Sequence, residues 1–309
     1  MAEILSDTID FSAYMRQTDA SVKVRPAAAF IAELEAEFAH RDGGVKSAMI
    51  STKLRDVIEF RPGEVTVWAG YNGHRKSLFA GQVALDLCCQ RERSLIASME
   101  MSPGRTLARM VRQAYGCAVP TFTDRKAFTD WTNGRLWLFD HLGRVTPDSL
   151  IAVCNYFALE LNGRHVFIDS MMMVCSSEES LDEQKQFATD LCRLGQETGL
   201  HVHLIAHCRK PQSGAEDKPP TKYDLRGSAA ISDQASNVIT VWSNKAKKAA
   251  LDKNPNDDEA FQQPDAAVTV EKQRNGAWEG RVKLWWDDAS LRFCDDRTSA
   301  IHPYRMGAA

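Results

Sequence analysis

Three common features are missing from this sequence, and each absence excludes a class of protein. Its eight cysteines include no C-x-x-C pair, so neither a zinc ribbon nor a thioredoxin-type redox motif is supported. No apolar run approaches the length that spans a bilayer, and the N-terminus lacks the pattern of a signal peptide. The formal net charge of −3 gives no global basic field, so nucleic-acid binding would require a local surface. We therefore expect a soluble, cytoplasmic protein with no membrane partner and with free thiols.

The chain has 309 residues, of which 44% are apolar and 26% are charged, as in ordinary globular proteins. This length can hold one large α/β domain, or one domain with an appendage. We predict an N-terminal extension over residues 1–50 and a core domain over residues 51–309. Within the extension, Ala27–His40 has the composition and periodicity of an amphipathic helix. Its apolar face carries Phe30, Leu34 and Phe38. The helix is expected to pack either on its own domain or on a neighbouring subunit.

Beyond residue 60, apolar strand-like runs alternate with helical patterns. The strand candidates are Glu64–Ala69, Ser94–Glu100, Leu136–Asp140, His165–Ser170, His201–Cys208 and Asn237–Trp242. Pro147–Leu161 and Leu181–Thr198 show the apolar periodicity of helices. This alternation predicts an α/β fold whose mostly parallel sheet carries helices on both faces. The polar segment Lys245–Pro264 is expected to be exposed. The last strand candidates are Ala267–Gln273, Gly280–Trp286 and Leu291–Cys294.

A glycine-rich turn follows the first strand candidate and ends in Lys-Ser at the start of a helix. Its residues are Gly70, Tyr71, Asn72, Gly73, His74, Arg75, Lys76, Ser77 and Leu78. Unpaired backbone N–H groups at a helix start bind anions, lysine reaches terminal phosphates and serine ligates magnesium. The turn therefore predicts a site for ATP, or another nucleoside triphosphate, with Mg²⁺. Lys76 would contact the β/γ-phosphates and Ser77 would hold the metal.

Arg75 departs from the phosphate-loop pattern G-x-x-x-x-G-K-[ST], which has glycine at this position. Its backbone N–H still serves the phosphate cradle, but its side chain has three possible fates. It can swing outward, add a cation beside the phosphates, or distort the loop and weaken nucleotide binding. We expect nucleotide binding to be retained, because the other residues of the site are intact.

Three later strand candidates end in polar side chains that suit a nucleotide site. Ligands of α/β folds bind at the carboxyl ends of the strands, so Glu100, Asp169 and His207 are expected beside the phosphate loop. Glu100 can orient and deprotonate the attacking water, and Asp169 can hold hydrated magnesium. His207 can hydrogen-bond a γ-phosphate and report its loss. Each residue alone has the plainer interpretation of a solvated strand end, but their order after the phosphate loop favours the site.

The region after His207 carries a more specific resemblance. The run Tyr223-Asp-Leu-Arg-Gly-Ser228, which follows a strand-end histidine and a polar loop, resembles hexameric replicative helicases with RecA-type cores. These include the helicase half of phage primase–helicases, the mitochondrial helicase Twinkle and the bacterial DnaB-type helicases. The similarity runs from about Phe60 to Cys294. It implies a RecA-like ATPase core preceded by a linker helix, Ala27–His40, that docks on the neighbouring subunit.

The resemblance implies a role for each candidate residue. Gly70 to Ser77 match the ATP loop except at Arg75. Glu100 matches the catalytic glutamate, Asp169 the magnesium-coupled aspartate and His207 the γ-phosphate sensor. The loop between strands matches a DNA-binding loop of the central channel, and its candidate residues are Arg209, Lys210, Lys218, Lys222, Arg226 and Gly227. Lys272 and Arg274 match the lysine and arginine that act on ATP held by the next subunit.

The implied function is an ATP-dependent replicative DNA helicase that forms a homo-oligomeric ring, expected to be a hexamer. It would move 5'-3' on single-stranded DNA and hydrolyse ATP at subunit junctions, in the cytoplasm of a bacterial host if a phage encodes it. Phage relatives carry a zinc-binding primase module ahead of the helicase. This sequence has no such ligand set, so a separate primase is expected, with a polymerase or loader as further partners.

Two alternatives stay open at this point. The first is a RecA/RadA-type recombinase filament with the same nucleotide chemistry, although Lys272, Arg274 and the Asp-Leu-Arg-Gly-Ser run argue against it. The second is a catalytically impaired RecA-fold ring, with a phosphate loop spoiled by Arg75, that acts as a scaffold or loader partner.

Overall fold

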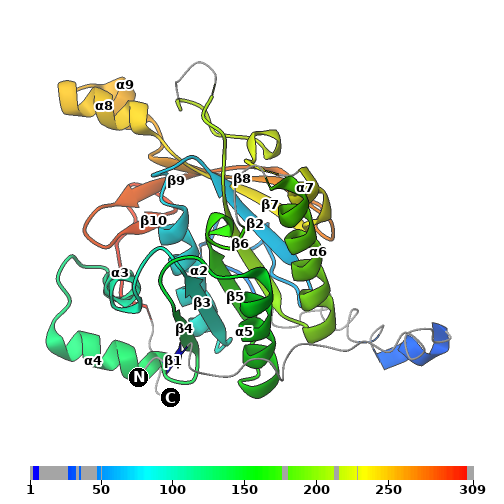
Figure 1. Ribbon diagram of the computed structural model, residues 1–309. Coiled ribbons are helices and arrows are strands. Elements are labelled where there is room, and N and C mark those ends of the chain that lie inside the picture. Colours follow the sequence, from blue (N-terminus) through cyan, green and yellow to red (C-terminus); the bar gives the residue numbers. More distant parts are fainter. Residues whose placement is uncertain are drawn as a thin grey trace.

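A ten-stranded sheet runs through the part of the chain that the structure describes (Figure 1). The computed structural model describes residues 3–6, 27–32, 35, 47–49, 51–175, 180–211, 216–227 and 229–304. The strand order is β1-β4-β3-β5-β6-β2-β7-β8-β9-β10. The strands are β1 (Glu3–Ser6), β2 (Val65–Gly70), β3 (Ser94–Ser98), β4 (Leu136–Asp140), β5 (His165–Asp169), β6 (His201–His207), β7 (Asn237–Ser243), β8 (Ala266–Gln273), β9 (Gly280–Asp287) and β10 (Arg292–Cys294).

The sheet is parallel from β1 to β7 and antiparallel from β7 to β10. All six residues of β2 are buried, as expected for a parallel strand covered on both faces. Because β2 lies between β6 and β7, and β5 lies between β3 and β6, the ends of these strands meet at one edge. The predicted mostly parallel α/β sheet is confirmed.

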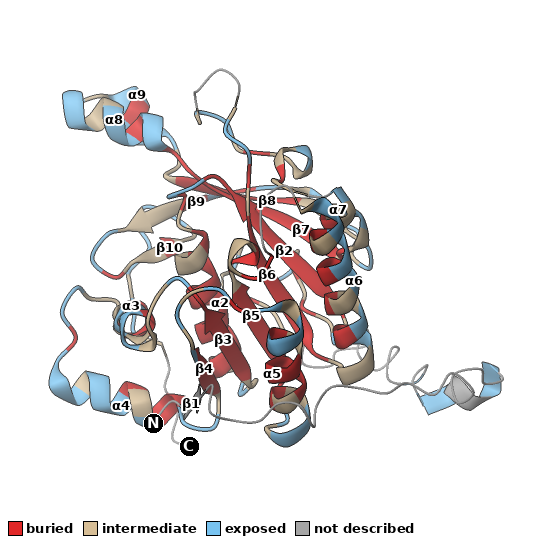
Figure 2. Ribbon diagram, viewed as in Figure 1, coloured by how far each residue is buried: buried red, intermediate tan, exposed pale blue. Residues whose placement is uncertain are grey.

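Helices cover both faces of the sheet, also as predicted (Figure 1). One face packs on α5 (Pro147–Glu160), α6 (Leu181–Thr198) and α7 (Ala229–Gln234). The other packs on α2 (Lys76–Cys89), α3 (Pro103–Tyr115) and α4 (Phe122–Thr132). Successive side chains of a strand point to opposite faces, so Val67 joins the first core and Trp68 the second. Figure 2 shows the resulting buried centre between exposed helix surfaces.

Several elements differ from the sequence-based expectation. The strands β3, β5 and β6 end one or two residues early, so Glu100 lies just beyond β3. The polar segment Lys245–Pro264 is mostly exposed, but it is helical, with α8 (Lys245–Lys253) and α9 (Asp258–Gln262) projecting from the body (Figures 1 and 2). Strand β1 was not foreseen; it pairs in parallel with β4 at the sheet edge.

The N-terminal extension is described in part. Of the predicted helix Ala27–His40, the structure describes a 3-10 helix, η3 (Ala27–Phe30), and helical residues at 31, 32 and 35. The rest of that helix lies outside the described residues. Ile31 is exposed, and Figure 1 shows the segment away from the sheet. Among the described helices, none has the length and apolar character needed to cross a membrane.

Candidate functional site

The phosphate loop connects the end of β2 to the start of α2. Glycine is required at its first position, because a Cβ on Gly70 would lie 2.4 Å from the carbonyl oxygen of Val241. Gly73 has a φ of +74°, a backbone conformation that glycine adopts without strain. The loop thus brings its backbone to the carboxyl edge of the sheet and starts α2 at Lys76. This is the strand–turn–helix context that the sequence predicted.

Arg75 holds the left-handed backbone that normally calls for glycine. Its φ is 63° and its ψ is 24°, a conformation that costs other residues about 1–2 kcal/mol. The guanidinium stacks on the ring of Trp286 in β9, 4.0 Å from the ring centroid. Burial lowers the pKa of Arg75, while Asp288 and Asp265 act in the opposite direction. The structure therefore holds the guanidinium against β9.

Lys76 lies at the centre of the loop and is buried. Its Nζ donates to the carbonyl oxygens of Gly70 and Tyr71, both at 2.9 Å. It also lies 3.2 Å from Nδ1 of His207. Burial lowers the pKa of this ammonium. A cation held in a desolvated loop attracts phosphate more strongly than the same cation in water.

Two carboxylates converge on the loop from neighbouring strands. Burial raises the pKa of Asp169, at the end of β5, to about 6, and a hydrogen bond from Ser77 opposes this shift. Glu100 follows β3 and is exposed, and its Oε1 accepts a 2.7 Å hydrogen bond from Oγ of Ser170. The structure thus places Ser77, Asp169 and Glu100 together, as the sequence predicted.

This pair of oxygen donors fits Mg²⁺. Ser77 and Asp169 offer the hard oxygen ligands that Mg²⁺ prefers, and the ion usually takes its remaining ligands from phosphates and water. A desolvated carboxyl with a raised pKa is a place where a cation restores the charged form. No cluster of three or more His, Cys, Asp or Glu residues suited to a metal occurs in the described part of the chain. A magnesium ion held by Ser77 and Asp169, with nucleotide and water as its remaining ligands, agrees both with the raised pKa of Asp169 and with the lack of such a cluster in the described residues.

His207 joins the loop to the strand beside it. Burial and the nearby Lys76 ammonium lower its pKa to about 4, so the ring is neutral at pH 7. Because the ammonium of Lys76 can only donate, Nδ1 of His207 is the acceptor of their contact. The proton of the neutral ring is then on Nε2. The histidine is held in one tautomer directly beside Lys76.

The basic loop, residues 209–227, rises from the end of β6. Its two ends pair, because the N–H of Arg209 donates to the carbonyl of Asp224 at 2.7 Å and that of Arg226 to His207 at 2.8 Å. Among its predicted cations, Arg209, Lys210 and Lys218 are exposed, whereas Lys222 and Arg226 are half-buried. Gly227 has a φ of +102°, and a Cβ there would collide with Gln184 of α6. The contact of Gly227 with DNA stays a prediction, but its φ and its closeness to Gln184 explain why this position needs glycine.

Lys272 and Arg274 do not reach the phosphate loop of their own chain. Gln273 pairs with Asn237, which pairs with Thr66 near the start of β2. Arg274 therefore lies about 15 Å along the sheet from Gly70, towards the opposite edge. Its Nη2 donates to the carbonyl of Asp233 at 3.2 Å, and Nζ of Lys272 donates to the same oxygen at 2.8 Å.

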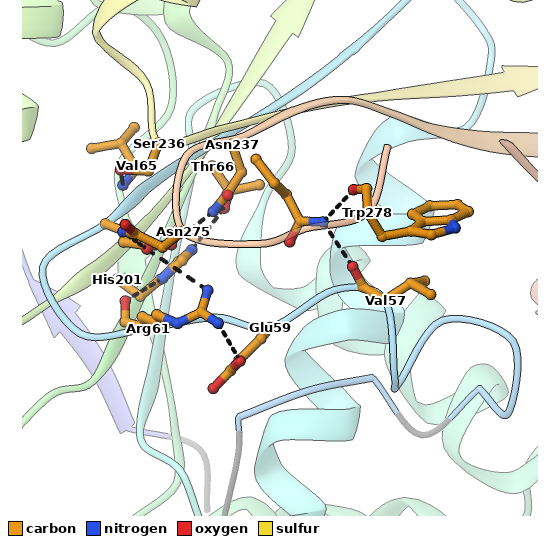
Figure 3. A network of polar contacts seen from close by, with 12 residues as sticks. Val57, Glu59, Arg61, Val65, Thr66, His201, Ser236, Asn237, Asn275 and Trp278 are labelled. Atoms are coloured by element: carbon orange, nitrogen blue, oxygen red, sulfur yellow. Dashed lines mark hydrogen bonds and ion pairs between the residues drawn. The ribbon is translucent and has the colours of Figure 1, made fainter. Parts of the chain in front are cut away.

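The hairpin that carries Arg274 is anchored by a polar network (Figure 3). Nδ2 of Asn275 donates to Oε1 of Glu64 at 2.6 Å, and Nδ2 of Asn237 donates to Oε2 at 2.9 Å. Glu64 is buried, whereas Arg274 and Asn275 are exposed. The network fixes the base of the hairpin and leaves the Arg274 side chain at the molecular surface.

Sequence reasoning missed several residues at this site. Ser170, which bonds Glu100, directly follows Asp169, so its position in the sequence was a usable signal. Trp286, which stacks on Arg75, and Glu216, which contacts His74, gave no such signal. These contacts join segments that are more than 100 residues apart, and only the fold brings them together.

Comparisons with known proteins agree with this fold. The family model described as the DnaB-like helicase C terminal domain matches residues 45–295. The fold is similar to a solved structure described as an ATPase domain, with a TM-score of 0.72 and 16% identity over 88% of this chain and 100% of that one. It is also similar to "The Structure Of A DnaB-Like Replicative Helicase And Its Interactions With Primase", with a TM-score of 0.68 and 16% identity over 88% of this chain and 67% of that one.

Proposed function

The chain belongs to the DnaB-like helicase C-terminal domain family, the ATP-hydrolysing motor of ring-shaped replicative helicases, and we propose that its subunits share their ATP sites. In this proposal each subunit binds ATP with its own phosphate loop and acts on its neighbour's ATP with Lys272 and Arg274. The observation that carries the proposal is the position of Arg274. It is exposed and about 15 Å from the phosphate loop of its own chain, so a cis role is out of reach.

The residues of the cis site divide the chemistry among them. Mg²⁺, held by Ser77 and Asp169, would neutralise charge on the phosphates when bound. Lys76 would bind the β/γ-phosphates through an ammonium that the loop already desolvates. Glu100, oriented by the Ser170 hydroxyl, would position and deprotonate the attacking water. Arg274 from the neighbour would stabilise the charge that develops on the transferred phosphoryl group.

The basic loop would carry the response to DNA. Its exposed cations Arg209, Lys210 and Lys218 provide the local positive charge that the net charge of −3 does not provide. His207 touches Lys76 on one side and, through its backbone carbonyl, holds the N–H of Arg226 at the base of the loop. Loss of the γ-phosphate would therefore be transmitted to the basic loop through a single residue, His207. We infer translocation on single-stranded DNA, in the 5'-3' direction that the family resemblance implies.

Assembly follows from the shared site. We propose a homo-oligomeric ring, with a hexamer as its form, because a monomer or an open end would leave a phosphate loop without Arg274. Within the extension, the helix predicted over Ala27–His40 would dock on the neighbour, and the exposure of Ile31 supports this role. A primase supplied as a separate protein, with a polymerase or loader, would complete the replication machinery. One structural relative is described with its primase interactions.

A DNA-dependent ATPase assay tests the proposal directly. We expect purified protein to hydrolyse ATP faster when single-stranded DNA is added, and Lys76→Ala to abolish turnover. Replacing Arg209 and Lys210 by alanine should weaken DNA binding and reduce its salt slope by about 2, while nucleotide binding stays unchanged. Unchanged turnover in Lys76→Ala would show that the loop is not the ATP site. Electron microscopy that found open filaments and no closed rings would overturn the shared-site ring.

A further inference from the structure

His74 of the phosphate loop makes a contact that the proposed mechanism does not use. Its side chain is fully buried, although Asn72 and Gly73 directly before it are exposed. On one side, Nδ1 lies 3.1 Å from the backbone N–H of Ser243, at the end of β7. On the other side, Nε2 lies 2.8 Å from Oε2 of Glu216. Glu216 belongs to the returning limb of the basic loop.

The direction of these hydrogen bonds follows from the donors. The backbone N–H of Ser243 can only donate, so Nδ1 of His74 accepts and carries no proton. Burial lowers the pKa of His74, which keeps the ring neutral with its proton on Nε2. This proton is therefore donated to the Glu216 carboxylate. The contact is a charge-assisted hydrogen bond of fixed direction, about twice as strong as a neutral one.

Glu216 is held in place at both its side chain and its main chain. Nζ of Lys245, at the start of α8, donates to the same Oε2 at 2.7 Å, and a hydrogen bond from Lys245 lowers the pKa of Glu216. Nε1 of Trp242 donates to the main-chain carbonyl of Glu216 at 2.8 Å. Lys245 also donates to the carbonyl of Asn72, inside the phosphate loop, at 3.2 Å. One carboxylate thus joins the basic loop, the phosphate loop and α8.

We propose that Glu216 is a positioning residue that couples the basic loop to the phosphate loop through His74. The inference rests on the proposed function, in which the basic loop contacts DNA. His74 is two residues before Lys76, so a shift of Glu216 moves the segment that sets the lysine and the backbone N–H groups of the phosphate cradle. The coupling is separate from the route through His207, which contacts the loop at Arg226. DNA held by the loop would act on the ATP site through both contacts.

The side chain of His74 allows a matched pair of variants. His74→Asn keeps an acceptor near the position of Nδ1 and removes the donor that reaches Glu216. His74→Gln keeps a donor near the position of Nε2 and should preserve the coupling. Glu216→Ala removes the acceptor, and Asp217→Ala, at the exposed next residue, is the control for loss of one negative charge.

The experiment measures steady-state ATPase with and without saturating single-stranded DNA, together with the Kd for that DNA. We expect Glu216→Ala and His74→Asn each to reduce the DNA stimulation of kcat by at least about threefold, with Kd changed less than about twofold, and the double variant to equal either single variant. His74→Gln should lose less of the DNA stimulation than His74→Asn, and Asp217→Ala should keep it. Additive effects in the double variant, or an equal loss in Asp217→Ala, would overturn the coupling.

A second readout separates this inference from the proposed function. If the Arg209 and Lys210 variants bind DNA normally, the DNA role of the basic loop is wrong. The cycle of Glu216→Ala and His74→Asn is then read from the KM for ATP without DNA. Raised and non-additive KM values support the contact between the two loops, whereas additive or unchanged values exclude it.

Discussion

At residue 75 the chain keeps a left-handed backbone without using glycine. The strain of this conformation costs about 1–2 kcal/mol, and a cation–π contact of a partly desolvated arginine returns about 1 kcal/mol. The stack of Arg75 on Trp286 also holds the guanidinium against β9. The strain of arginine in place of glycine at position 75 is therefore largely compensated by the stack on the indole ring of Trp286.

Two substitutions of Arg75 test this compensation. Arg75→Ala keeps the left-handed backbone and loses the stack, so we expect the free energy of unfolding to fall by about 1 kcal/mol. Arg75→Gly loses the stack but removes the strain, so its stability should stay within about 0.5 kcal/mol of the parent and its KM for ATP within about threefold. Urea denaturation and steady-state ATPase measure both. Equal destabilisation by alanine and glycine would show that strain plays no part.

Ser170 offers a second test at the scale of one residue. Its hydroxyl is fully buried and donates to Oε1 of Glu100, which is otherwise exposed. We expect Ser170→Ala to lower kcat about tenfold with little change in the KM for ATP, because the proposed general base, Glu100, loses its orientation but no phosphate contact is removed. Ser149→Ala, at an exposed position on α5, is the control. A raised KM with an unchanged kcat would place Ser170 in nucleotide binding instead.

At the scale of secondary-structure elements, the hairpin between β8 and β9 separates Arg274 from its own ATP site. Arg274→Ala should therefore inactivate only the junction where the subunit acts as the neighbour, and Glu100→Gln only the junction where it binds ATP. Each variant alone should be inactive. In rings mixed at equal concentrations, about one quarter of the junctions pair an intact Glu100 with an intact Arg274.

The readout is the ATPase rate of the mixture. We expect it to rise to a substantial fraction of the rate that one quarter of intact junctions would give. A mixture as inactive as its components, with subunit exchange verified, would argue against a shared site. Asn275→Ala, which releases the hairpin from Glu64, should behave like a weaker Arg274 variant and be rescued by the same partner.

The elements also show why the sequence predicted some parts of this fold and not others. The central strands were found because they are apolar runs buried on both faces, so the pattern needs no tertiary information. Strand β1 was missed because its pairing with β4 joins residues more than 130 positions apart. The helices α8 and α9 were missed because their sequence is polar and only Lys247 and Ala260 are buried.

The same distinction separates the residues of the candidate site that could be predicted from the sequence from those that could not. Glu100, Asp169 and His207 could be predicted because the carboxyl ends of parallel strands share one edge, so their order in the sequence determines their proximity. The stack of Arg75 on Trp286 and the contact between His74 and Glu216 could not be predicted. They depend on where Trp286 and the returning limb of the basic loop lie after folding.

At the scale of the whole molecule, the proposed function gives one sheet groups for two different ATP sites. The phosphate loop, Asp169 and His207 lie at its carboxyl edge, and Arg274 lies towards the opposite edge. A sheet with both sets cannot complete either site alone, whereas head-to-tail copies complete every site if the rotation closes. The strands rigidly connect the phosphate loop at one edge to Arg274 at the other. A conformational change at one ATP site would therefore be transmitted to the next site in the proposed ring.

Three buried histidines in the core of the sheet make the stability of the folded state depend on pH. His165, His201 and His203 are buried side by side, and burial lowers the pKa of each, that of His201 to about 4. Nε2 of His201 lies 2.8 Å from Oγ1 of Thr66, and Nδ1 of His165 lies 3.2 Å from Nε2 of His203. In the unfolded chain these rings have a pKa of about 6.5, so they protonate before the folded rings do.

The folded state is therefore favoured above pH 6.5 and loses stability as the pH falls towards 4. For His201 alone the difference of about 2.5 pKa units corresponds to at most about 3 kcal/mol. We expect the free energy of unfolding to fall by several kcal/mol between pH 7 and pH 4.5, measured by urea denaturation at each pH. His201→Gln should reduce this dependence, because the amide can still bond Thr66 but does not titrate. His302→Gln, at an exposed position, should leave the slope unchanged, and an equal reduction by both variants would contradict the role of the buried cluster.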